Sequence, residues 1–358
     1  MRTVGVEEEF LVFDAVRPQL RDSGPSVVAA DPPGDGQFEK ELKRAQVELA
    51  CEPTADLGRL GTDVMGLRAG LARAASRHGA RLVASGTNPL PADDAAVTRD
   101  HRYEAMTEQF AAVARTQLTC ALHVHVSIEK GEEAAVLAGI APWLHVLTAL
   151  SANSPFHQGK DTGYASYRRL LWGQWPTAGP LAVVADAAEY RSLVNDLVAT
   201  GAARDEGMIY FDARLSPRYP TVEIRVCDVC PSVDDTMLVA GLARALVATA
   251  ARRPTDVRVR PELLVAAGWG AARWGLTGEL ADLTGAAGSA RLAPASTLVD
   301  ALLEHVRTAL DEAGDARRVR DGLTDVLRSG TGSERQRAAA KDGGLTAVID
   351  TLTVAAND

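Results

Sequence analysis

Four short segments of the sequence place ionisable side chains two positions apart, with apolar residues between them. The pairs are Glu7 and Glu9, His123 and His125, Asp212 and Arg214, and Glu223 and Arg225. Because side chains alternate along a β-strand, each pair would share one face of its strand. Carboxylates with one or two imidazoles suit hard divalent cations such as Mg²⁺ or Mn²⁺. Arginines beside such cations are a common means of neutralising a triphosphate during phosphoryl transfer.

These pairs have a second interpretation, in which an antiparallel sheet simply exposes one face to solvent. Solvated faces are usually rich in Lys, Thr, Ser and Glu, whereas these pairs are Glu/Glu, His/His, Asp/Arg and Glu/Arg. The successive carboxylates of Glu7, Glu8 and Glu9 would be costly in a core strand without a metal, a cationic partner or a water-filled cleft. We therefore expect a sheet whose polar face lines an active site, with Glu8 on the opposite face.

Residue chemistry alone selects a set of metal ligands and one phosphate contact. The predicted ligands are Glu7, Glu9, Glu48, one of the two histidines, and Glu223. Arg225 is predicted to contact the transferring phosphate of ATP. The sequence has no P-loop, no G-x-G-x-x-G after a strand and no G-x-S-x-G motif. A nucleophile-based hydrolase therefore has no support.

Local patterns predict the elements that would position these residues. The predicted elements are strands at 46–50, 81–84 and 118–128 and helices at 57–71, 103–115 and 136–147. Residues 18–36 are rich in Pro, Gly and Asp, which indicates a loop and a candidate active-site flap. From Met237 onward the pattern is almost wholly helical.

The composition is that of a globular protein. The chain has 358 residues, 46% of them apolar and 24% charged, and we expect one domain over 1–358 with a helical C-terminal part from about residue 232. A net charge of −9 argues against nucleic acid as a partner, because phosphate backbones require a basic surface.

The same sequence predicts neither export nor a disulfide scaffold. No apolar leader precedes the first strand, and the longest apolar segment, 237–251, is too short to cross a membrane. We therefore expect a cytoplasmic protein with no membrane partner. Cys227-x-x-Cys230 could be a redox pair or half a zinc site, but no second such motif is present, so two buried thiols are favoured.

Several motifs, taken in order, resemble those of the bacterial carboxylate–amine ligases, the second type of glutamate–cysteine ligase. They are Gly5 to Phe10, His123 to Val126, Asn153 to Phe156, Thr162 to Arg168, Trp175-Pro176-Thr177 and Glu223 to Asp228. The resemblance covers nearly the whole chain. It implies an α+β, glutamine-synthetase-like catalytic domain, whose mainly antiparallel sheet forms the floor of a funnel-shaped ATP site and is backed by helices. It also implies the reaction, in which ATP phosphorylates a carboxylate, an amine attacks the acyl phosphate, and an amide, ADP and phosphate are released.

The resemblance assigns roles to residues of this sequence. The metal ligands that it implies are Glu7, Glu9, Glu41, Glu48, His123 and Glu223. Glu41 enters this set because it precedes Glu48 by seven residues, and His123 is preferred over His125. Arg225 is the expected catalytic residue that contacts the phosphate of the bound nucleotide. Arg168, Arg214 and Tyr164 are candidate substrate-binding residues, the two arginines for substrate carboxylates.

The substrates are less defined than the metal site. The family pattern usually has His, Gly and Trp where this sequence has Asn88, Ala121 and His157, so the substrate pocket departs from the pattern. We expect small-molecule carboxylate and amine substrates, amino acids foremost, and the sequence leaves a homodimer open. Two alternatives are a metal-dependent kinase or hydrolase on the same acidic face and a non-catalytic binding protein that retains the fold. The ligase is favoured over the binding protein because every proposed metal ligand is present.

Overall fold

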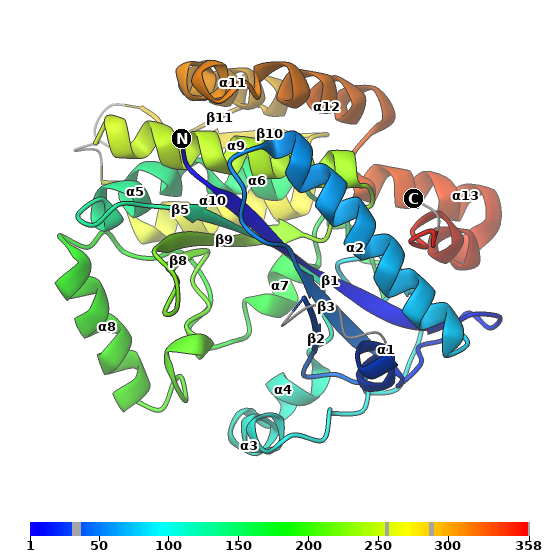
Figure 1. Ribbon diagram of the computed structural model, residues 1–358. Helices are drawn as coiled ribbons and strands as arrows, with labels where there is room; N and C mark the ends of the chain where they lie inside the picture. The colour runs from blue at the N-terminus through cyan, green and yellow to red at the C-terminus, as the bar shows by residue number, and fades with distance from the viewer. Residues whose placement is uncertain (31–36, 255–257, 286–289, 357–358) are drawn as a thin grey trace.

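The structure, a computed structural model, describes residues 1–30, 37–254, 258–285 and 290–356 (Figure 1). Among these residues, seven strands form one antiparallel sheet in the order β2-β3-β1-β5-β9-β8, with β4 paired to the second half of β1. The strands are β1 (Val4–Asp14), β2 (Phe38–Lys40), β3 (Gln46–Ala50), β4 (Ala80–Val83), β5 (Ala121–Ser127), β8 (Ala213–Leu215) and β9 (Thr221–Asp228). The long central strand β1 thus pairs with three others.

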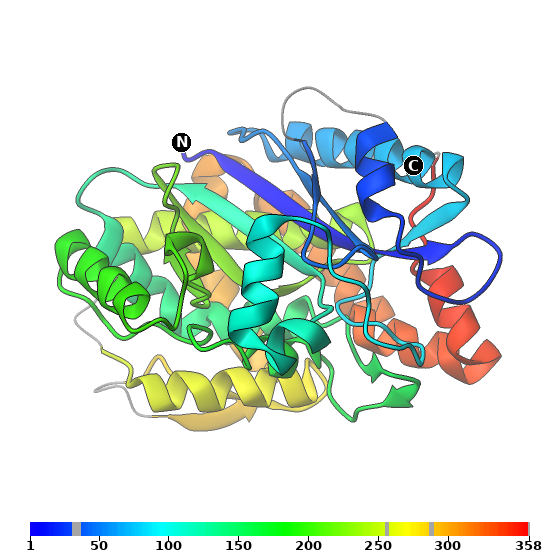
Figure 2. The same cartoon turned by 90° about the horizontal axis from the view of Figure 1, so that it is seen from below.

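Helices cover one face of this sheet (Figure 1). Two long helices of this layer, α2 (Leu57–Arg77) and α9 (Val233–Arg252), contact each other and β1. The other α-helices of the described residues, of which α3 and α4 lie on the opposite side of the sheet (Figure 2), are α1 (Gly24–Ala30), α3 (His101–Phe110), α4 (Ala112–Thr116), α5 (Glu133–Ile140), α6 (Leu144–Leu150), α7 (Arg168–Trp172), α8 (Ala187–Ala199), α10 (Pro261–Trp274), α11 (Ala295–Ala313), α12 (Ala316–Ser329) and α13 (Gly332–Thr351). Two small hairpins join β6 (Phe156–His157) to β7 (Lys160–Asp161) and β10 (Glu279–Asp282) to β11 (Arg291–Pro294).

The alternation of side chains along β1 separates its three glutamates. Glu8 lies on the helical side of the sheet, where it is fully buried and forms a two-point ion pair with Arg68 of α2, at 2.6 and 2.7 Å. Arg68 also donates to the carbonyl of Cys230 at 2.9 Å. The charge of Arg68 offsets the free-energy cost of burying the Glu8 carboxylate in the core. Glu7 and Glu9 therefore face the opposite side, as the sequence predicts.

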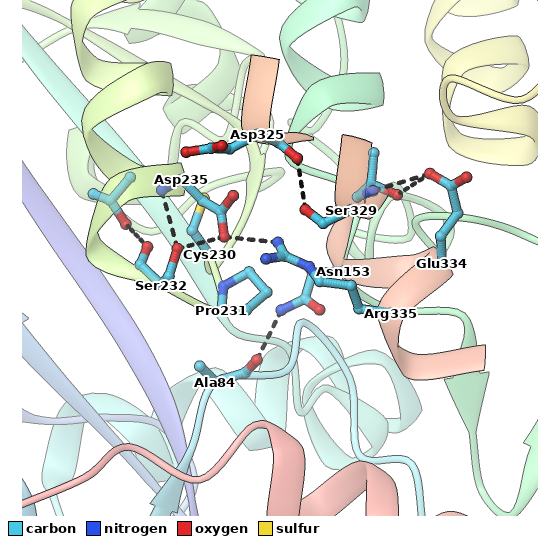
Figure 3. A network of polar contacts seen from close by, with 12 residues as sticks. Ala84, Asn153, Cys230, Pro231, Ser232, Asp235, Asp325, Ser329, Glu334 and Arg335 are labelled. Carbon is cyan, nitrogen blue, oxygen red and sulfur yellow. Dashed lines mark hydrogen bonds and ion pairs between the residues drawn. The ribbon is translucent and has the colours of Figure 1, made fainter. Parts of the chain in front are cut away.

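A polar network fastens the helical layer to the ends of the strands (Figure 3). Asn153 donates from Nδ2 to the carbonyl of Ala84, just after β4, at 2.7 Å. Ser232 accepts from the backbone N–H of Asp235 at 3.1 Å and caps α9, and Asp235 pairs with Arg335 of α13 at 2.7 Å. The C-terminal helix is therefore tied to the start of α9, and the motif at Asn153 has a structural role.

Several segments differ from the sequence prediction. The predicted helix at 136–147 is divided into α5 and α6 by a short 3₁₀ helix at 141–143. The predicted loop at 18–36 is wrong for 24–30, which form α1 because Val27 is buried; 31–36 lie outside the described residues. The predicted helix at 103–115 is two helices, interrupted at Ala111, where φ is +48°. The region after Met237 is almost wholly helical, as predicted, with the short hairpin of β10 and β11 as the exception among the described residues.

Two further features bear on the expected class of protein. Among the described residues, one segment, Glu133–Leu150, is long and apolar enough to cross a membrane by length and composition, and 67% of it is buried in the fold. It comprises α5 and α6, which pack against α9, α10 and β9.

Cys227 and Cys230 are buried, free thiols, as expected.

Candidate active site

The register of the strands sets an acidic row across the face opposite the helices. Glu39 of β2 pairs with Glu48 of β3, and Glu48 pairs with Glu9 of β1. Paired residues in neighbouring strands place their side chains on the same face, close to one another. Like charges directly opposite are unfavourable, so this row requires a positive partner or protons.

The next rows of the same face add imidazoles and guanidinium groups. Glu7 pairs with His123 of β5, and Glu223 of β9 pairs with both His125 of β5 and Arg214 of β8. The paired ionisable residues of the sequence therefore meet because four antiparallel strands expose the same alternation on one face. Neither this arrangement nor its register can be derived from a single strand.

A cavity of about 310 Å³ opens over this face. Its polar lining residues include Glu7, Glu9, Glu39, Glu41, Glu48, His123, Arg102, Arg214 and Arg225, and its aromatic ones are Tyr103, Trp172, Trp175 and Tyr210. A hollow of about 640 Å³ beside α9 and α11 is larger, but its arginines are already in ion pairs, Arg2 with Glu132, Arg244 with Asp315 and Arg252 with Glu312. The volume of a cavity therefore does not by itself identify the candidate active site. The carboxylates that lack a cationic partner identify it.

Three overlapping groups of side chains in the cavity could hold metal ions. They are Glu7 with His125 and Glu223, Glu7 with Glu48 and His123, and Glu9 with Glu41 and Glu48. Within each group the ligand atoms lie within 4.8 Å of one another. The groups share Glu7 and Glu48, so they form a continuous chain of oxygen and nitrogen ligands. This donor set suits hard divalent cations.

The carboxylates of the acidic row hold their protons more tightly than usual. Burial, opposed by Arg168 and other groups, raises the pKa of Glu9 to about 7. Burial, and then the charge of Glu9, raises the pKa of Glu41 to about 8. Burial, and then Glu7 and Glu41, also raises the pKa of Glu48 well above its ordinary value. Excess negative charge of this kind favours cation binding.

Glu7 differs from its neighbours because two imidazoles contact it. His123 Nδ1 lies 3.2 Å from Glu7 Oε2, and His125 Nε2 lies 3.2 Å from Glu7 Oε1. Although burial opposes the effect, these contacts hold the pKa of Glu7 well below its usual range. Burial and the nearby Arg225 lower the pKa of His123 to about 4, so its imidazole is neutral at pH 7, the form that binds metals. His123 Nε2 is buried and has no hydrogen-bond partner among the described residues.

The arginines on β8 and β9 converge on one carboxylate. Arg214 donates to Glu223 through Nε at 2.7 Å and Nη2 at 3.2 Å, and Arg225 also forms an ion pair with Glu223. Despite burial, this positive charge holds the pKa of Glu223 below its usual range. The Arg225 guanidinium lies over Trp172, 5.4 Å from the ring centroid, and over Tyr210, at 5.7 Å. These contacts fix Arg225 in the cavity wall.

Two predicted substrate-binding residues are absent from the lining of the cavity, although Arg168 lies behind it, near Glu9 and over the ring of Trp172. Arg168 is 1% exposed and donates to the carbonyl of Arg225 at 3.2 Å, with Asp228 3.9 Å away. The Tyr164 hydroxyl accepts from Trp269 of α10 at 3.2 Å. Neither residue lines the cavity. The role of Arg168 and Tyr164 in binding substrate stays a prediction. Arg214 lines the cavity and is paired with Glu223.

Sequence reasoning missed several residues of the cavity. Glu39 precedes Glu41 by two positions, a local signal of the kind that identified the other pairs. Trp172, Tyr210 and Arg102 carry no such signal, because their position depends on how separate segments fold over the sheet. Of the departures from the family pattern, Ala121 contacts the site directly, since its backbone N–H donates to Glu9 Oε2 at 2.8 Å.

Comparison with known proteins matches this site to a family. Residues 3–351 match the profile of the glutamate-cysteine ligase family 2. The chain belongs to that family. A Frankia alni protein, provisionally named glutamate–cysteine ligase 2-2, is 47% identical over 98% of this chain and 96% of its own length. Family membership supports a carboxylate–amine ligase and confirms the resemblance predicted from the motifs.

Solved structures confirm the fold at low sequence identity. The glutamate–cysteine ligase of Francisella tularensis, solved with AMP, has a TM-score of 0.71 and 13% identity, over 98% of this chain and 87% of that chain. The bifunctional glutathione synthetase of Pasteurella multocida has a TM-score of 0.69 and 14% identity, over 98% of this chain and 51% of that longer one. The predicted α+β, glutamine-synthetase-like fold of the family is therefore correct.

Proposed function

We propose that this member of glutamate–cysteine ligase family 2 is an ATP-dependent carboxylate–amine ligase. In the proposed reaction a carboxylate oxygen takes the γ-phosphoryl group of ATP and ADP departs. The amine then attacks the acyl carbon, the bond to phosphate breaks, and an amide remains. The observation that supports this most strongly is the chain of three overlapping ligand groups beside Arg225 in one cavity. Amino acids are the proposed substrates, with glutamate and cysteine as the first pair to test.

The acidic face fits divalent cations, Mg²⁺ or Mn²⁺. The proposed ligands are Glu7, Glu9, Glu41, Glu48, His123 and Glu223, with His125 as a further candidate because it belongs to the group of Glu7 and Glu223. Raised carboxylate pKa values and the unpartnered His123 Nε2 are the features expected of ligands whose positive partner is a metal. Bound cations would neutralise the polyphosphate and the charge that moves between its oxygens.

Arg225 is the proposed phosphate-binding residue. Its guanidinium lines the cavity and is held by Glu223 and the two aromatic rings, so little ordering would be needed when an anion binds. Fixed positive charge at the transferring group stabilises the transition state. Trp172, Trp175 and Tyr210 form an aromatic wall beside it, which would exclude water from a hydrolysable acyl phosphate.

An ADP-release screen of amino acids and amines, with Mg²⁺ and purified protein, tests this function. We expect ADP release that requires both a carboxylate and an amine, with an amide product formed in equal amount. ADP release with a carboxylate alone, and no amide, would instead support a kinase or a hydrolase. No nucleotide turnover with any pair would favour a binding protein that retains the fold.

A further inference from the structure

Helix α10, the yellow helix along the lower edge of Figure 2, exposes large apolar side chains on one face. Its inner face is buried at Leu264, Ala267 and Ala271, and the helix packs against α6. On the outer face Val265 is 55% exposed and Trp269 is 48% exposed. Single exposed apolar residues are common, but large ones grouped on one helix face are typical of a surface that meets another molecule.

The exposed indole of Trp269 is held in a fixed position. Its Nε1 donates to the hydroxyl of Tyr164 at 3.2 Å. The segment that carries Tyr164 is itself bound to α10, because the backbone N–H groups of Ala165 and Ser166 donate to the carbonyl of Ala272 at 2.8 and 2.9 Å. The face is therefore ordered before any contact is made, which lowers the entropic cost of association.

The spacing of residues along this face is the same in both directions. The residues at its centre are Glu262, Ala266, Trp269 and Arg273, at intervals of four, three and four. Such intervals keep side chains on one face of a helix. A second copy of α10 that lies antiparallel to the first would present the same pattern. Glu262 would then lie opposite the partner's Arg273, and Ala266 opposite the partner's Trp269.

The two charged ends of this pattern are complementary. Neither Glu262 nor Arg273 forms an ion pair with a described residue. Arg273 instead donates to the carbonyl of Gly163 and lies over the rings of Trp274 and Tyr164, 4.0 and 5.5 Å from their centroids. Its charge is therefore available to a carboxylate. In an antiparallel pair the two-fold axis would form this contact twice.

The side-chain volumes on the face are complementary in the same alignment. Val265 and Gly270 are equally distant from the midpoint of the pattern, so Val265 would lie opposite the partner's Gly270. A Cβ atom added at Gly270 would meet no atom within 4 Å, so there is open space at this position. Large residues would thus lie opposite small ones, Val265 against glycine and Trp269 against alanine. This arrangement lets two helices approach to the usual distance of about 8–10 Å.

We propose that α10 forms the interface of a homodimer, in which two copies of the helix pack antiparallel about a two-fold axis beside residues 267 and 268. A contact through one helix of 14 residues is smaller than the ~800 Å² per partner that stable complexes bury, so we expect a dissociation constant of about 1–100 µM. No residue of α10 lines the cavity over the sheet, so each subunit keeps its own candidate active site. The inference does not depend on the proposed ligase function.

Charge reversal at the two ends of the pattern tests both the interface and its alignment. Sedimentation velocity of the wild-type protein from about 1 to 200 µM should show a shift from monomer to dimer. E262K and R273E should each weaken the dimer by about 10- to 100-fold, because each brings like charges together twice. An equal mixture of E262K and R273E should dimerise again, because both contacts of the mixed dimer then join opposite charges. A mixture that associates no more than the separate variants would overturn the proposal.

G270L tests the same interface without removing a contact within the chain. The added side chain has open space in the monomer but would occupy the place of the partner's Val265. We expect G270L to be monomeric throughout this concentration range, with a Tm no lower than that of the wild type, since leucine is the better helix former. Gly66 of α2 has the same open space, and G66L should leave the dimer unchanged. A wild-type protein that stays monomeric, or a dimer that G270L does not weaken, would refute the interface.

Discussion

Substituting Glu41 by Gln should stabilise the metal-free protein while impairing its function. Glu41 shares a ligand group with Glu9 and Glu48, and burial followed by the charge of Glu9 raises its pKa from 4.5 to about 8. Its one recorded hydrogen bond, from the backbone N–H of Leu42 at 3.3 Å, can be accepted equally by the amide oxygen of glutamine. The substitution therefore removes repulsion without removing a contact.

The sign of the pH dependence follows from the raised pKa. In the folded protein Glu41 keeps a proton that the unfolded chain releases between pH 4.5 and about 8, so the free energy of unfolding falls as the pH rises through this interval. A pKa raised from 4.5 to about 8 corresponds to at most about 5 kcal/mol, at ~1.4 kcal/mol for each pH unit. Because Glu41 is partly exposed and titrates together with its neighbours, we expect about 1–3 kcal/mol. For a chain of this size that is a Tm increase of about 1–4 °C.

Thermal unfolding in EDTA at pH 5, 7 and 9 measures this effect. The Tm of wild-type protein should fall more steeply with pH than that of E41Q, and the two should differ most at pH 9. The exposed Glu52 provides a control, since E52Q should follow the wild-type curve. In saturating Mg²⁺ the order should reverse, because binding stabilises the folded state by about 2.7 kcal/mol at 100 times Kd and E41Q would bind less. An E41Q protein with unchanged or lower Tm at pH 9 in EDTA would refute the reasoning.

Three further substitutions test other parts of the structure. E223Q should destabilise the protein by about 3–5 kcal/mol in urea unfolding, opposite in sign to E41Q, because it leaves the buried Arg225 without its ion-pair partner and removes the charge that Arg214 contacts. A loss below ~1 kcal/mol would contradict the pairing. R68A should lower the free energy of unfolding by about the same amount, because it leaves Glu8 buried without an ion-pair partner. If the double variant R68A/E8L regains stability, the unpaired charge of Glu8 is the cause of the loss. A111G should raise the free energy of unfolding by about 0.5–1 kcal/mol, because Ala111 has a φ of +48° that glycine adopts freely; lower stability would show that this backbone is not strained.

The active face was predictable from the sequence because its signal is local. Alternation along β1, β5 and β9 marks Glu7, His123 and Glu223 without knowledge of how the strands pair. The same alternation places Glu8 on the helical side, where Arg68 neutralises it. The pairing of the strands then determines which ligands lie side by side, as Glu48 does between Glu39 and Glu9. This pairing depends on the whole sheet and cannot be derived from the alternation within one strand.

Residues whose role depends on long-range packing were not predictable in the same way. Arg168 was selected from a polar loop, but the fold buries its guanidinium near Asp228. Arg102 lies in an ordinary amphipathic segment and reaches the cavity only because α3 crosses the sheet. The break at Ala111 likewise escaped prediction, since alanine is a good helix former and only tertiary contacts impose its positive φ.

The central claim, an acyl-phosphate ligase, is tested most directly by identifying the spent nucleotide. Positive charge fixed by Arg225 beside the ligand groups favours transfer of the terminal phosphoryl group over attack at the α-phosphorus. Chromatography of a complete reaction with ATP, Mg²⁺, carboxylate and amine should show ADP and phosphate, each equal to the amide formed, and no AMP. AMP and pyrophosphate as the main products would contradict both the mechanism and the role assigned to Arg225.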